Sequence, residues 1–386
     1  MRSVSIIAAG LSKFGENWDE SYRQMIAKAA LEALSSNVVE GKEIEAIFGG
    51  TMASGRFIGQ EHIGALIADQ LGLNPIASTR VEAACASGGV ALRQGFTAVA
   101  SGMYDIVAVG GAEKMTDVST EQAAFALGGA GDQETELFHG ATFPALYALL
   151  AQKHMEKFGT TEEMMASCAV KNHHNAMHNP IAQFHKEFSI ADVMNSGYIA
   201  SPLKLLDCSP ITDGAAVLIL CETSKAKKLS DQAIEIVGSG QASDSLALTG
   251  RKSLTQLDAT MLAAKHALAQ AKATPKDIDV AEVHDCFTIA EILAIEDLGF
   301  FKKGSGGTAS LGGETEINGQ VAVNPSGGLK ACGHPVGATG VKQAAEIFYQ
   351  LNGIAGKRQR KDAEIGLTHN VGGSGATAVV HVYKKA

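Results

Sequence analysis

Cys85 is the residue best placed to do chemistry, because it lies in the segment Val-Glu-Ala-Ala-Cys-Ala-Ser-Gly-Gly at positions 81–89. Residues 79–83 predict a strand, and apolar residues at helical spacing over 90–99 predict a helix. A cysteine at such a junction receives the positive end of the helix dipole, which favours the thiolate over the thiol. The Ser-Gly-Gly that follows leaves the backbone bare, so we expect a bulky acyl group to approach closely. These features indicate a nucleophile, although most free cysteines are simply small buried residues.

His334 is the second candidate. It belongs to the segment Gly-His-Pro-Val-Gly-Ala-Thr-Gly at positions 333–340, which precedes a predicted amphipathic helix at 341–351. We expect this loop to be a second strand-to-helix junction, in which Pro335 stiffens the backbone beside the histidine. A histidine there can take a proton from a thiol or from a carbon acid near neutral pH. A setting of several glycines and a proline is more typical of a catalytic or ligand-binding loop than of a structural histidine.

Two further loops complete the set. A predicted buried strand at 280–283 ends in His284, Asp285 and Cys286, before a helix that begins near Ile289. A predicted strand at 364–368 runs into the sequence His-Asn-Val-Gly-Gly-Ser-Gly and then into another strand. Four polar or glycine-rich loops that follow apolar strands predict one active site assembled from four places.

The order of the elements indicates an internal duplication. In each half a loop, a helix, a strand and a Gly-Gly pair recur in that order, and strand–helix alternation favours a mainly parallel buried sheet. Between the halves lies a segment that is rich in methionine and histidine. Its His173, His174 and His178 could suggest a metal site. No carboxylate or cysteine nearby completes a ligand set, so a solvated helix face is the favoured interpretation.

Taken in order, the four loops resemble the fingerprints of the thiolase family, and the resemblance covers essentially the whole chain. Two loops depart from the usual forms. His-Asp-Cys-Phe at 284–287 replaces Asn-Glu-Ala-Phe, and Asn-Val-Gly at 370–372 replaces Cys-x-Gly. Both departures are similar to the sterol-carrier-protein-2-type thiolases and the archaeal acetoacetyl-CoA thiolases.

The resemblance implies an α/β fold of two duplicated βαβαβαββ halves, which form a five-layered αβαβα core with an inserted loop domain. The first half would cover residues 1–115 and be completed by about 205–235. The inserted domain would be 116–204, covering the active site and helping to bind coenzyme A, and the second half would be 236–386.

The resemblance also implies reversible Claisen condensation of acetyl-CoA, or thiolysis of 3-ketoacyl-CoA, through an acyl thioester on Cys85. His334 would accept the Cys85 proton. His334 and His284, the latter through a water or directly, would stabilise the enolate oxygen. The backbone N–H groups of Cys85 and Gly372 would form the oxyanion hole for the acyl-enzyme carbonyl.

A second base must remove a proton from the α-carbon of acetyl-CoA. Thiolases usually supply it from Cys-x-Gly, but this chain has Asn370 there, and an amide cannot titrate. Cys286, two residues beyond His284, is the better replacement. Cys332, two residues before His334, is the runner-up.

Two alternatives differ in function. A related ketoacyl synthase or acyltransferase would pair its cysteine with two histidines, but such enzymes generally remove a carboxyl group, and Cys286 argues against this. A thiolase-like subunit could instead act mainly as a scaffold in a complex. Archaeal relatives associate with a 3-hydroxy-3-methylglutaryl-CoA synthase and a small OB-fold protein, so these are the expected partners, beside a homodimer or homotetramer.

Composition and charge limit the partners and the cellular compartment that we expect for this protein. The 386 residues carry a net charge of −9, which implies no general affinity for nucleic acid or an anionic membrane. Six cysteines without close pairing indicate a reducing compartment, and no signal peptide or apolar span is recognised, so we expect a cytoplasmic enzyme. No zinc-site spacing is present. Coenzyme A thioesters would be substrates, met by a local basic patch, with no metal and no tightly bound cofactor.

Overall fold

The computed structural model describes residues 2–35 and 38–386. The first half of the chain contains β1 (Val4–Leu11), α1 (Tyr22–Leu34), β2 (Ala46–Gly50), α2 (Ser54–Phe57), α3 (Ile63–Gln70), β3 (Ala77–Val81), α4 (Ser87–Ser101), β4 (Ile106–Glu113), β7 (Gly214–Glu222) and α9 (Thr223–Leu229). Between β4 and β7 lie α5 (Thr120–Gly128), α6 (Phe143–Phe158), α7 (Glu162–Ala176), α8 (Ile190–Asn195), β5 (Tyr198–Ala200) and β6 (Leu203–Lys204).

The second half contains β8 (Ile234–Ser243), α10 (Asp258–Ala271), β9 (Val280–Glu282), α11 (Thr288–Asp297), α12 (Gly306–Leu311), β10 (Ala322–Val323), α13 (Gly328–Cys332), α14 (Thr339–Leu351), β11 (Ile365–Gly372) and β12 (Thr377–Lys385). Each half supplies five strands, in the order β3-β2-β4-β7-β1 and β10-β9-β11-β12-β8. Both orders read as the third, second, fourth, fifth and first strand of the half, so the predicted duplication is confirmed.

The sheet differs from the expected one in two respects. It is mixed rather than mainly parallel, because the fifth strand of each half pairs antiparallel with the fourth. In the second half β11 and β12 form a hairpin, and hairpin strands are antiparallel. In addition, β1 pairs with β8 at Ser5↔Glu235 and Ile6↔Ile234, which joins the two expected sheets into one of ten strands.

Helices cover both outer faces and also fill the space between the two half-sheets. Apolar residues of α4 and α14 pack together and against strands of both halves. On the outside, α1 and α3 bury apolar residues on the first half, while α10 and α11 do so on the second. The five layers of the predicted αβαβα core are therefore present.

The N-termini of α4 and α14 approach each other very closely. A Cβ on Gly88 would lie 2.7 Å from the carbonyl oxygen of Gly337, and one on Gly340 would lie 2.1 Å from the backbone nitrogen of Gly89. Both glycines after Cys85 are buried. The expectation that they clear space for an acyl group is wrong, because they allow the two central helices to meet.

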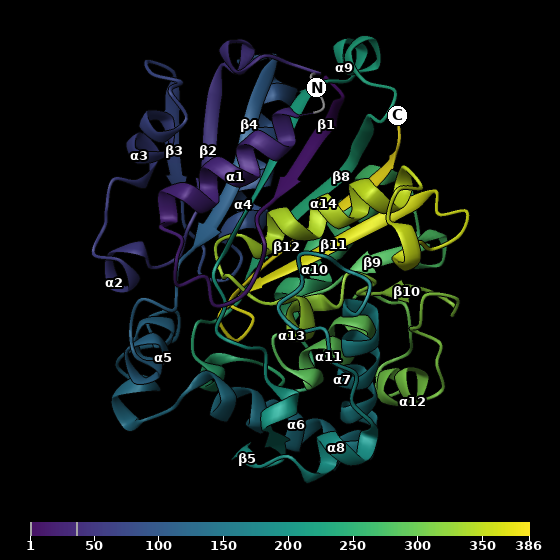
Figure 1. Ribbon diagram of the computed structural model, residues 1–386. Coiled ribbons are helices and arrows are strands. Elements are labelled where there is room, and N and C mark those ends of the chain that lie inside the picture. The colour runs from purple at the N-terminus through teal and green to yellow at the C-terminus, as the bar shows by residue number, and fades with distance from the viewer. Residues whose placement is uncertain (1, 36–37) are drawn as a thin grey trace.

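The inserted segment takes the place of a hairpin turn. In the second half a short turn joins β11 to β12, whereas about a hundred residues separate β4 from the equivalent strand β7. Figure 1 shows its helices α5, α6, α7 and α8 gathered at one end of the sheet, opposite the two termini. The domain boundaries at 116 and 204 stay a prediction. None of the described helices has both the length and the apolar character needed to cross a membrane.

Candidate active site

A cavity of about 180 Å³ lies where the loops of both halves meet the inserted segment. Cys85, His284, Cys286 and His334 all line it. The rest of the wall is mostly apolar and includes Met115, Leu127, Phe143, Tyr147, Ile211, Phe287 and Val336. The structure therefore brings the four predicted side chains to one place.

Cys85 is partly buried and lies two residues before the first residue of α4. The turn that presents it requires a left-handed backbone at Ala84, with φ of 52°. Burial raises the pKa of the Cys85 thiol to about 12, although a hydrogen bond from the backbone N–H of Gly373 acts in the opposite direction. The expected dipole-stabilised thiolate is therefore wrong, because the cost of burying a charge is larger. A neutral thiol needs a base to become a nucleophile.

His334 lies between α13 and α14, not at the strand-to-helix junction that we expected. Its Nδ1 is 2.7 Å from the hydroxyl oxygen of Thr339, which donates to the carbonyl oxygen of Pro335. A hydroxyl engaged in this way accepts the Nδ1 proton, which leaves Nε2 as a proton acceptor. Burial, with a smaller effect from Lys342, lowers the pKa of His334 to about 3. The ring is therefore a neutral base at ordinary pH.

His284 meets His334 edge to face, with ring centroids 5.0 Å apart. Its Nδ1 lies 3.0 Å from the side-chain nitrogen of Asn370, whereas its Nε2 is buried without a hydrogen-bond partner among the residues that the structure describes. Burial, followed by the neighbouring His334 and His369, holds the pKa of His284 well below its usual range. A buried donor without a partner costs about 1–3 kcal/mol, so this nitrogen is a place where a substrate oxygen would be stabilised.

Three side chains at the cavity are of types that can bind a metal ion. The sulfur of Cys85 and one ring nitrogen each of His284 and His334 lie within 4.8 Å of one another. A histidine that binds a metal normally donates its other ring N–H to a neighbour. The other nitrogen of His284 faces the amide group of Asn370 and accepts from it. Its Nε2 therefore holds a proton, and the set suits proton transfer better than metal binding.

Cys286 is buried at the cavity wall, with 7% of its surface exposed. Burial raises the pKa of its thiol well above the usual range, and the hydrogen bond that it shares with the Tyr147 hydroxyl opposes this. The side chain that hydrogen-bonds to this thiol is thus a tyrosine of α6. The Tyr147 hydroxyl also lies 3.1 Å from the carbonyl oxygen of Gly373. It therefore ties the Cys286 loop to the loop beside Cys85.

Cys332 is fully buried and does not line the cavity. The side-chain nitrogen of Asn179 lies 3.5 Å from its sulfur, and the charged groups around it are led by Lys342 and Glu282. Its thiol therefore faces the charged core beneath α14, away from the cavity. This placement favours Cys286 over Cys332 as the second base.

Gly372, predicted as an oxyanion-hole donor, is the last residue of β11 and packs tightly against the nucleophile loop. A Cβ there would lie 2.4 Å from the carbonyl oxygen of Ala83. The backbone N–H that reaches the Cys85 sulfur belongs to the next residue, Gly373, which also lines the cavity. The role of Gly372 as an oxyanion-hole donor stays a prediction, and Gly373 is a second candidate for that role.

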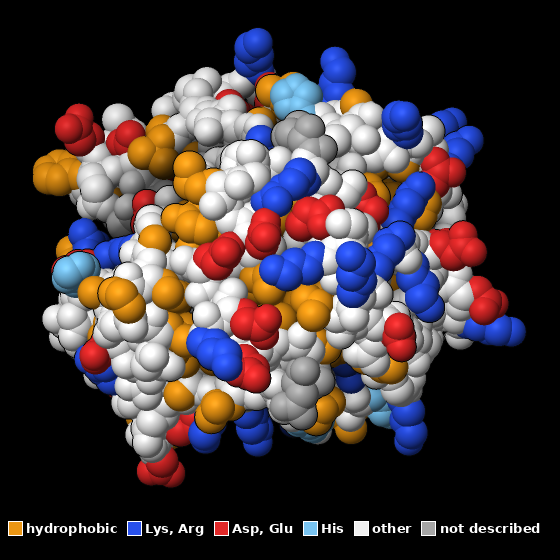
Figure 2. Space-filling view, turned by 90° about the horizontal axis from the view of Figure 1, so that it is seen from above, with side chains coloured by type: hydrophobic (Ala, Val, Ile, Leu, Met, Phe, Trp, Pro, Cys, Tyr) orange, Lys and Arg blue, Asp and Glu red, His pale blue; other side chains and the backbone are white. Residues whose placement is uncertain are grey.

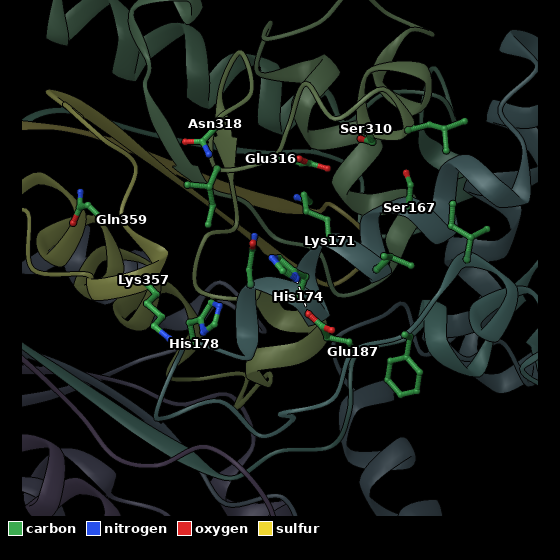
Figure 3. A pocket seen from close by; sticks show the side chains of 16 residues that line it. Ser167, Lys171, His174, His178, Glu187, Ser310, Glu316, Asn318, Lys357 and Gln359 are labelled. Carbon is green, nitrogen blue, oxygen red and sulfur yellow. Dashed lines mark hydrogen bonds and ion pairs between the residues drawn. The ribbon is translucent and has the colours of Figure 1, made fainter.

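His174 and His178 of the inserted segment line a different, larger cavity of about 710 Å³ (Figure 3). His174 points at Glu187, 2.7 Å away, and is exposed. His173 is buried and faces the carbonyl oxygen of Lys186 at 3.1 Å. Among the described residues, these histidines form no group of three with a spacing suited to a metal ion.

Sequence reasoning missed three residues of the site. Tyr147 lies in a helix without any motif, so no local signal marks it. Thr339 was visible within the glycine-rich loop, five residues after His334, but the turn at 336–338 is what brings its hydroxyl to the ring. Glu113 accepts hydrogen bonds from the backbone N–H groups of Met52 and Gly337. That carboxylate ties the first half to the His334 loop, a link that no local pattern shows.

The pH dependence of Cys85 acylation should reveal these buried histidines. An ordinary histidine has a pKa near 6.5, so its neutral form would fall about tenfold by pH 5.5. Because burial lowers the pKa of His334 to about 3, its neutral form persists through this range. We expect the rate of acylation by acetyl-CoA, followed by quenched-flow mass spectrometry, to stay within about twofold between pH 7.5 and 5.5.

Glu113 is the necessary control, because burial raises its pKa to about 7 and its charge faces Cys85. An inflection that disappears in Glu113→Gln would belong to that carboxyl. A tenfold loss that persists in Glu113→Gln would contradict the assignment of His334 as a buried neutral base.

Two family models together cover nearly the whole chain. The model described as "Thiolase, N-terminal domain" matches residues 4–224, and "Thiolase C-terminal domain-like" matches residues 240–385. The chain belongs to the thiolase family. The enzyme is therefore a thiolase-type acyltransferase, and the predicted family, fold and enzyme class are confirmed.

Curated relatives match this chain over nearly its whole length. An "Acetyl-CoA acetyltransferase" of Methanothermobacter thermautotrophicus is 55% identical to the enzyme, covering 100% of both chains. One of Methanocaldococcus jannaschii is 48% identical over 99% of each. Human "Sterol carrier protein 2" is 33% identical, covering 100% of this chain and 72% of that protein.

Solved structures share the fold at lower identity. The structure of an "Ltp2-ChsH2(DUF35) aldolase" has a TM-score of 0.86 at 24% identity, covering 99% of this chain and 98% of that one. An acetyl-CoA acetyltransferase from Syntrophomonas wolfei has a TM-score of 0.76 at 18% identity, covering 100% and 99%. At these identities the likeness concerns the fold alone.

Proposed function

We propose that the enzyme condenses two molecules of acetyl-CoA to acetoacetyl-CoA and, in reverse, cleaves short 3-ketoacyl-CoA with free coenzyme A. The observation that carries this proposal is the cavity itself. A neutral thiol, two neutral histidines and a second thiol face one small, mostly apolar space. The names of the two archaeal relatives support the same reaction.

Acylation comes first. Cys85 attacks the thioester carbonyl while His334 takes its proton at Nε2. The carbon–sulfur bond to coenzyme A then breaks, and Cys286 protonates the departing thiolate. The backbone N–H groups of Cys85 and of Gly372 or Gly373 would hold the oxyanion of the tetrahedral intermediate. The result is an acyl group on Cys85, a thiolate on Cys286 and a charged His334.

Condensation then uses the thiolate on Cys286 and the charged His334. The Cys286 thiolate removes a proton from the methyl group of a second acetyl-CoA. The enolate oxygen receives hydrogen bonds from the Nε2–H groups of His284 and of the charged His334. The enolate carbon attacks the acyl carbonyl on Cys85. The bond from that carbonyl to the Cys85 sulfur then breaks, and the sulfur regains its proton from His334. Cys85, Cys286 and His334 end the two steps in the protonation states in which they began. These two steps therefore balance without a further cofactor.

The substrates proposed are coenzyme A thioesters with short acyl groups. A cavity of about 180 Å³ lies well below the size of ordinary ligand pockets, and the aromatic side chains of Phe143 and Phe287 are part of its lining. Such a space accommodates an acetyl or acetoacetyl group more readily than a long chain. The residues that hold the phosphates of coenzyme A stay unassigned.

The deciding test is thiolysis of acetoacetyl-CoA, run beside longer 3-ketoacyl-CoA substrates and the Cys85→Ala variant. We expect cleavage of acetoacetyl-CoA by the wild-type enzyme, a lower kcat/KM for each longer chain, and no cleavage by Cys85→Ala. No turnover of any substrate would support the scaffold alternative. Release of carbon dioxide from malonyl-CoA without thiolysis would support the ketoacyl synthase alternative.

Association with other proteins belongs to the same proposal. Condensation of two thioesters is uphill, so a partner that consumes the product would favour it. One structural neighbour, the "Ltp2-ChsH2(DUF35) aldolase", is named together with a DUF35 component. We therefore keep the predicted partners, an HMG-CoA synthase and an OB-fold protein, together with a homodimer or homotetramer. Size-exclusion chromatography with light scattering, alone and with those two proteins, tests each.

Charge on one face is consistent with protein partners rather than nucleic acid. Figure 2 shows the end of the molecule that is uppermost in Figure 1, where Lys and Arg side chains are interspersed with Asp and Glu. Nucleic-acid sites usually gather one sign of charge on a face. Placement in the cytoplasm stays part of the proposal, to be tested by cell fractionation.

A further inference from the structure

The side chain of Asn370 connects the nucleophile loop to His284. Its amide nitrogen lies 3.0 Å from the carbonyl oxygen of Cys85 and 3.0 Å from Nδ1 of His284. Its amide oxygen lies 3.1 Å from the backbone nitrogen of Gly89. The residue is 1% exposed. The three contacts engage both the nitrogen and the oxygen of this buried amide group.

The neighbours of this amide permit only one orientation. A backbone N–H can only donate and a carbonyl oxygen can only accept. The oxygen of Asn370 must therefore face Gly89, and its NH₂ group must face Cys85. One hydrogen of that NH₂ group is left for Nδ1 of His284, which accepts it. A neutral imidazole that accepts at Nδ1 carries its proton at Nε2.

We propose that Asn370 is a positioning residue that fixes His284 in the Nε2–H tautomer, so that this histidine donates to the substrate oxygen. The proposal rests on the proposed function, in which that oxygen is the enolate of acetyl-CoA. It assigns a role to the residue that stands in place of the usual Cys-x-Gly cysteine. The two departures from the usual thiolase loops are thus the two partners of one hydrogen bond.

The surroundings keep the ring neutral, which the tautomer assignment requires. Burial contributes most to the low pKa of His284, and His334 and His369 are the titratable groups that act on it in the same direction. Within residues 2–35 and 38–386, Nε2 has no hydrogen-bond partner, and the His284 side chain lines the cavity. A fixed N–H that points into the cavity without a partner is what a developing oxyanion needs.

The first test reads the tautomer without any substrate. Protein labelled with ¹⁵N-histidine, with signals assigned through His284→Gln and His334→Gln, is examined by long-range ¹H–¹⁵N NMR near pH 8. We expect His284 to be neutral with its proton on Nε2. In Asn370→Asp, a carboxylate replaces the NH₂ group, and the proton should move to Nδ1. Because no turnover is involved, this result is independent of whether the proposed reaction occurs.

The second test separates the two chemical steps. Loss of one oxyanion donor costs about 10²–10³-fold. We expect Asn370→Asp to slow solvent hydrogen exchange into the methyl group of acetyl-CoA by about 100-fold more than it slows acylation of Cys85. A purely structural defect would reduce both rates together.

Asn175→Asp is the matched control. Asn175 is also a buried asparagine, and its amide nitrogen donates to the carbonyl oxygen of Asn324, away from the cavity. It should leave the His284 tautomer and the ratio of the two rates unchanged. An Nδ1–H tautomer of His284 in the wild-type protein, or an unchanged tautomer in Asn370→Asp, would overturn the proposal. If Asn370→Asp does not fold, the wild-type tautomer alone decides.

Discussion

Replacement of Cys85 by alanine should abolish acyl transfer while leaving the fold intact. The thiol is the only group at the cavity in a position to carry an acyl group with His334 beside it as a neutral base, among the residues that the structure describes. Loss of a covalent nucleophile in comparable enzymes costs at least about 10⁴-fold. We expect thiolysis of acetoacetyl-CoA to fall by that factor or more, measured by the loss of substrate absorbance.

Location of the acyl group gives an independent check. Wild-type enzyme incubated with acetyl-CoA, quenched in acid and digested, should carry the acetyl group on the peptide that contains Cys85. Cys221 is a suitable control, because it is buried near the end of β7 and does not line the cavity, and Cys221→Ala should label as the wild type does. An acetyl group found on Cys286 or Cys332 would reject the assignment.

Replacement of Cys286 by serine should cripple condensation and thiolysis but leave acylation of Cys85 largely intact. Carbon–carbon chemistry needs a group that moves a proton at the α-carbon, and general acid–base catalysis contributes about 10²–10⁴-fold. Serine preserves the size of the side chain and its contact with Tyr147, but a hydroxyl cannot act as the thiolate does. We expect condensation to fall by about 10³-fold and acetylation of Cys85 by less than about threefold.

Hydrogen exchange from solvent into the methyl group of acetyl-CoA measures the step directly. Exchange should be lost in Cys286→Ser and kept in Cys332→Ala, because the Cys332 sulfur faces Asn179 and the buried charges beneath α14. The two variants remove the same kind of side chain from buried sites, so they control for each other. Exchange that survives in Cys286→Ser but disappears in Cys332→Ala would reverse the two roles.

Local sequence predicted which loops form the site because each carries its own chemical signature. Cys85 before a glycine-rich helix, His334 among glycines, and His284 with Cys286 after a buried strand all stand within a few residues of their motifs. The repeat of loop, helix, strand and Gly-Gly predicted the duplication in the same way. The five layers of the αβαβα core were predicted from the family resemblance, because no single helix or strand specifies how the layers stack.

Protonation was not predictable from those motifs. A helix N-terminus suggested a thiolate at Cys85, yet burial raises its pKa to about 12. The energy of a buried charge depends on every group around it, and these come from the far half and from the inserted segment. For the same reason, the partner of Cys286 is Tyr147, a residue about 140 positions away that no motif marks.

The nucleophile candidate, the four loops, the duplication and the family could all be read from the chain alone, because these depend on residue types at short spacing. The folded molecule was needed to show that Cys286 faces the cavity and Cys332 does not, and that Asn370 and Thr339 hydrogen-bond to the two histidines. It was also needed to show that the glycines after Cys85 bring α4 and α14 together. Each of these depends on contacts between distant segments, and packing in three dimensions rather than local pattern fixes them.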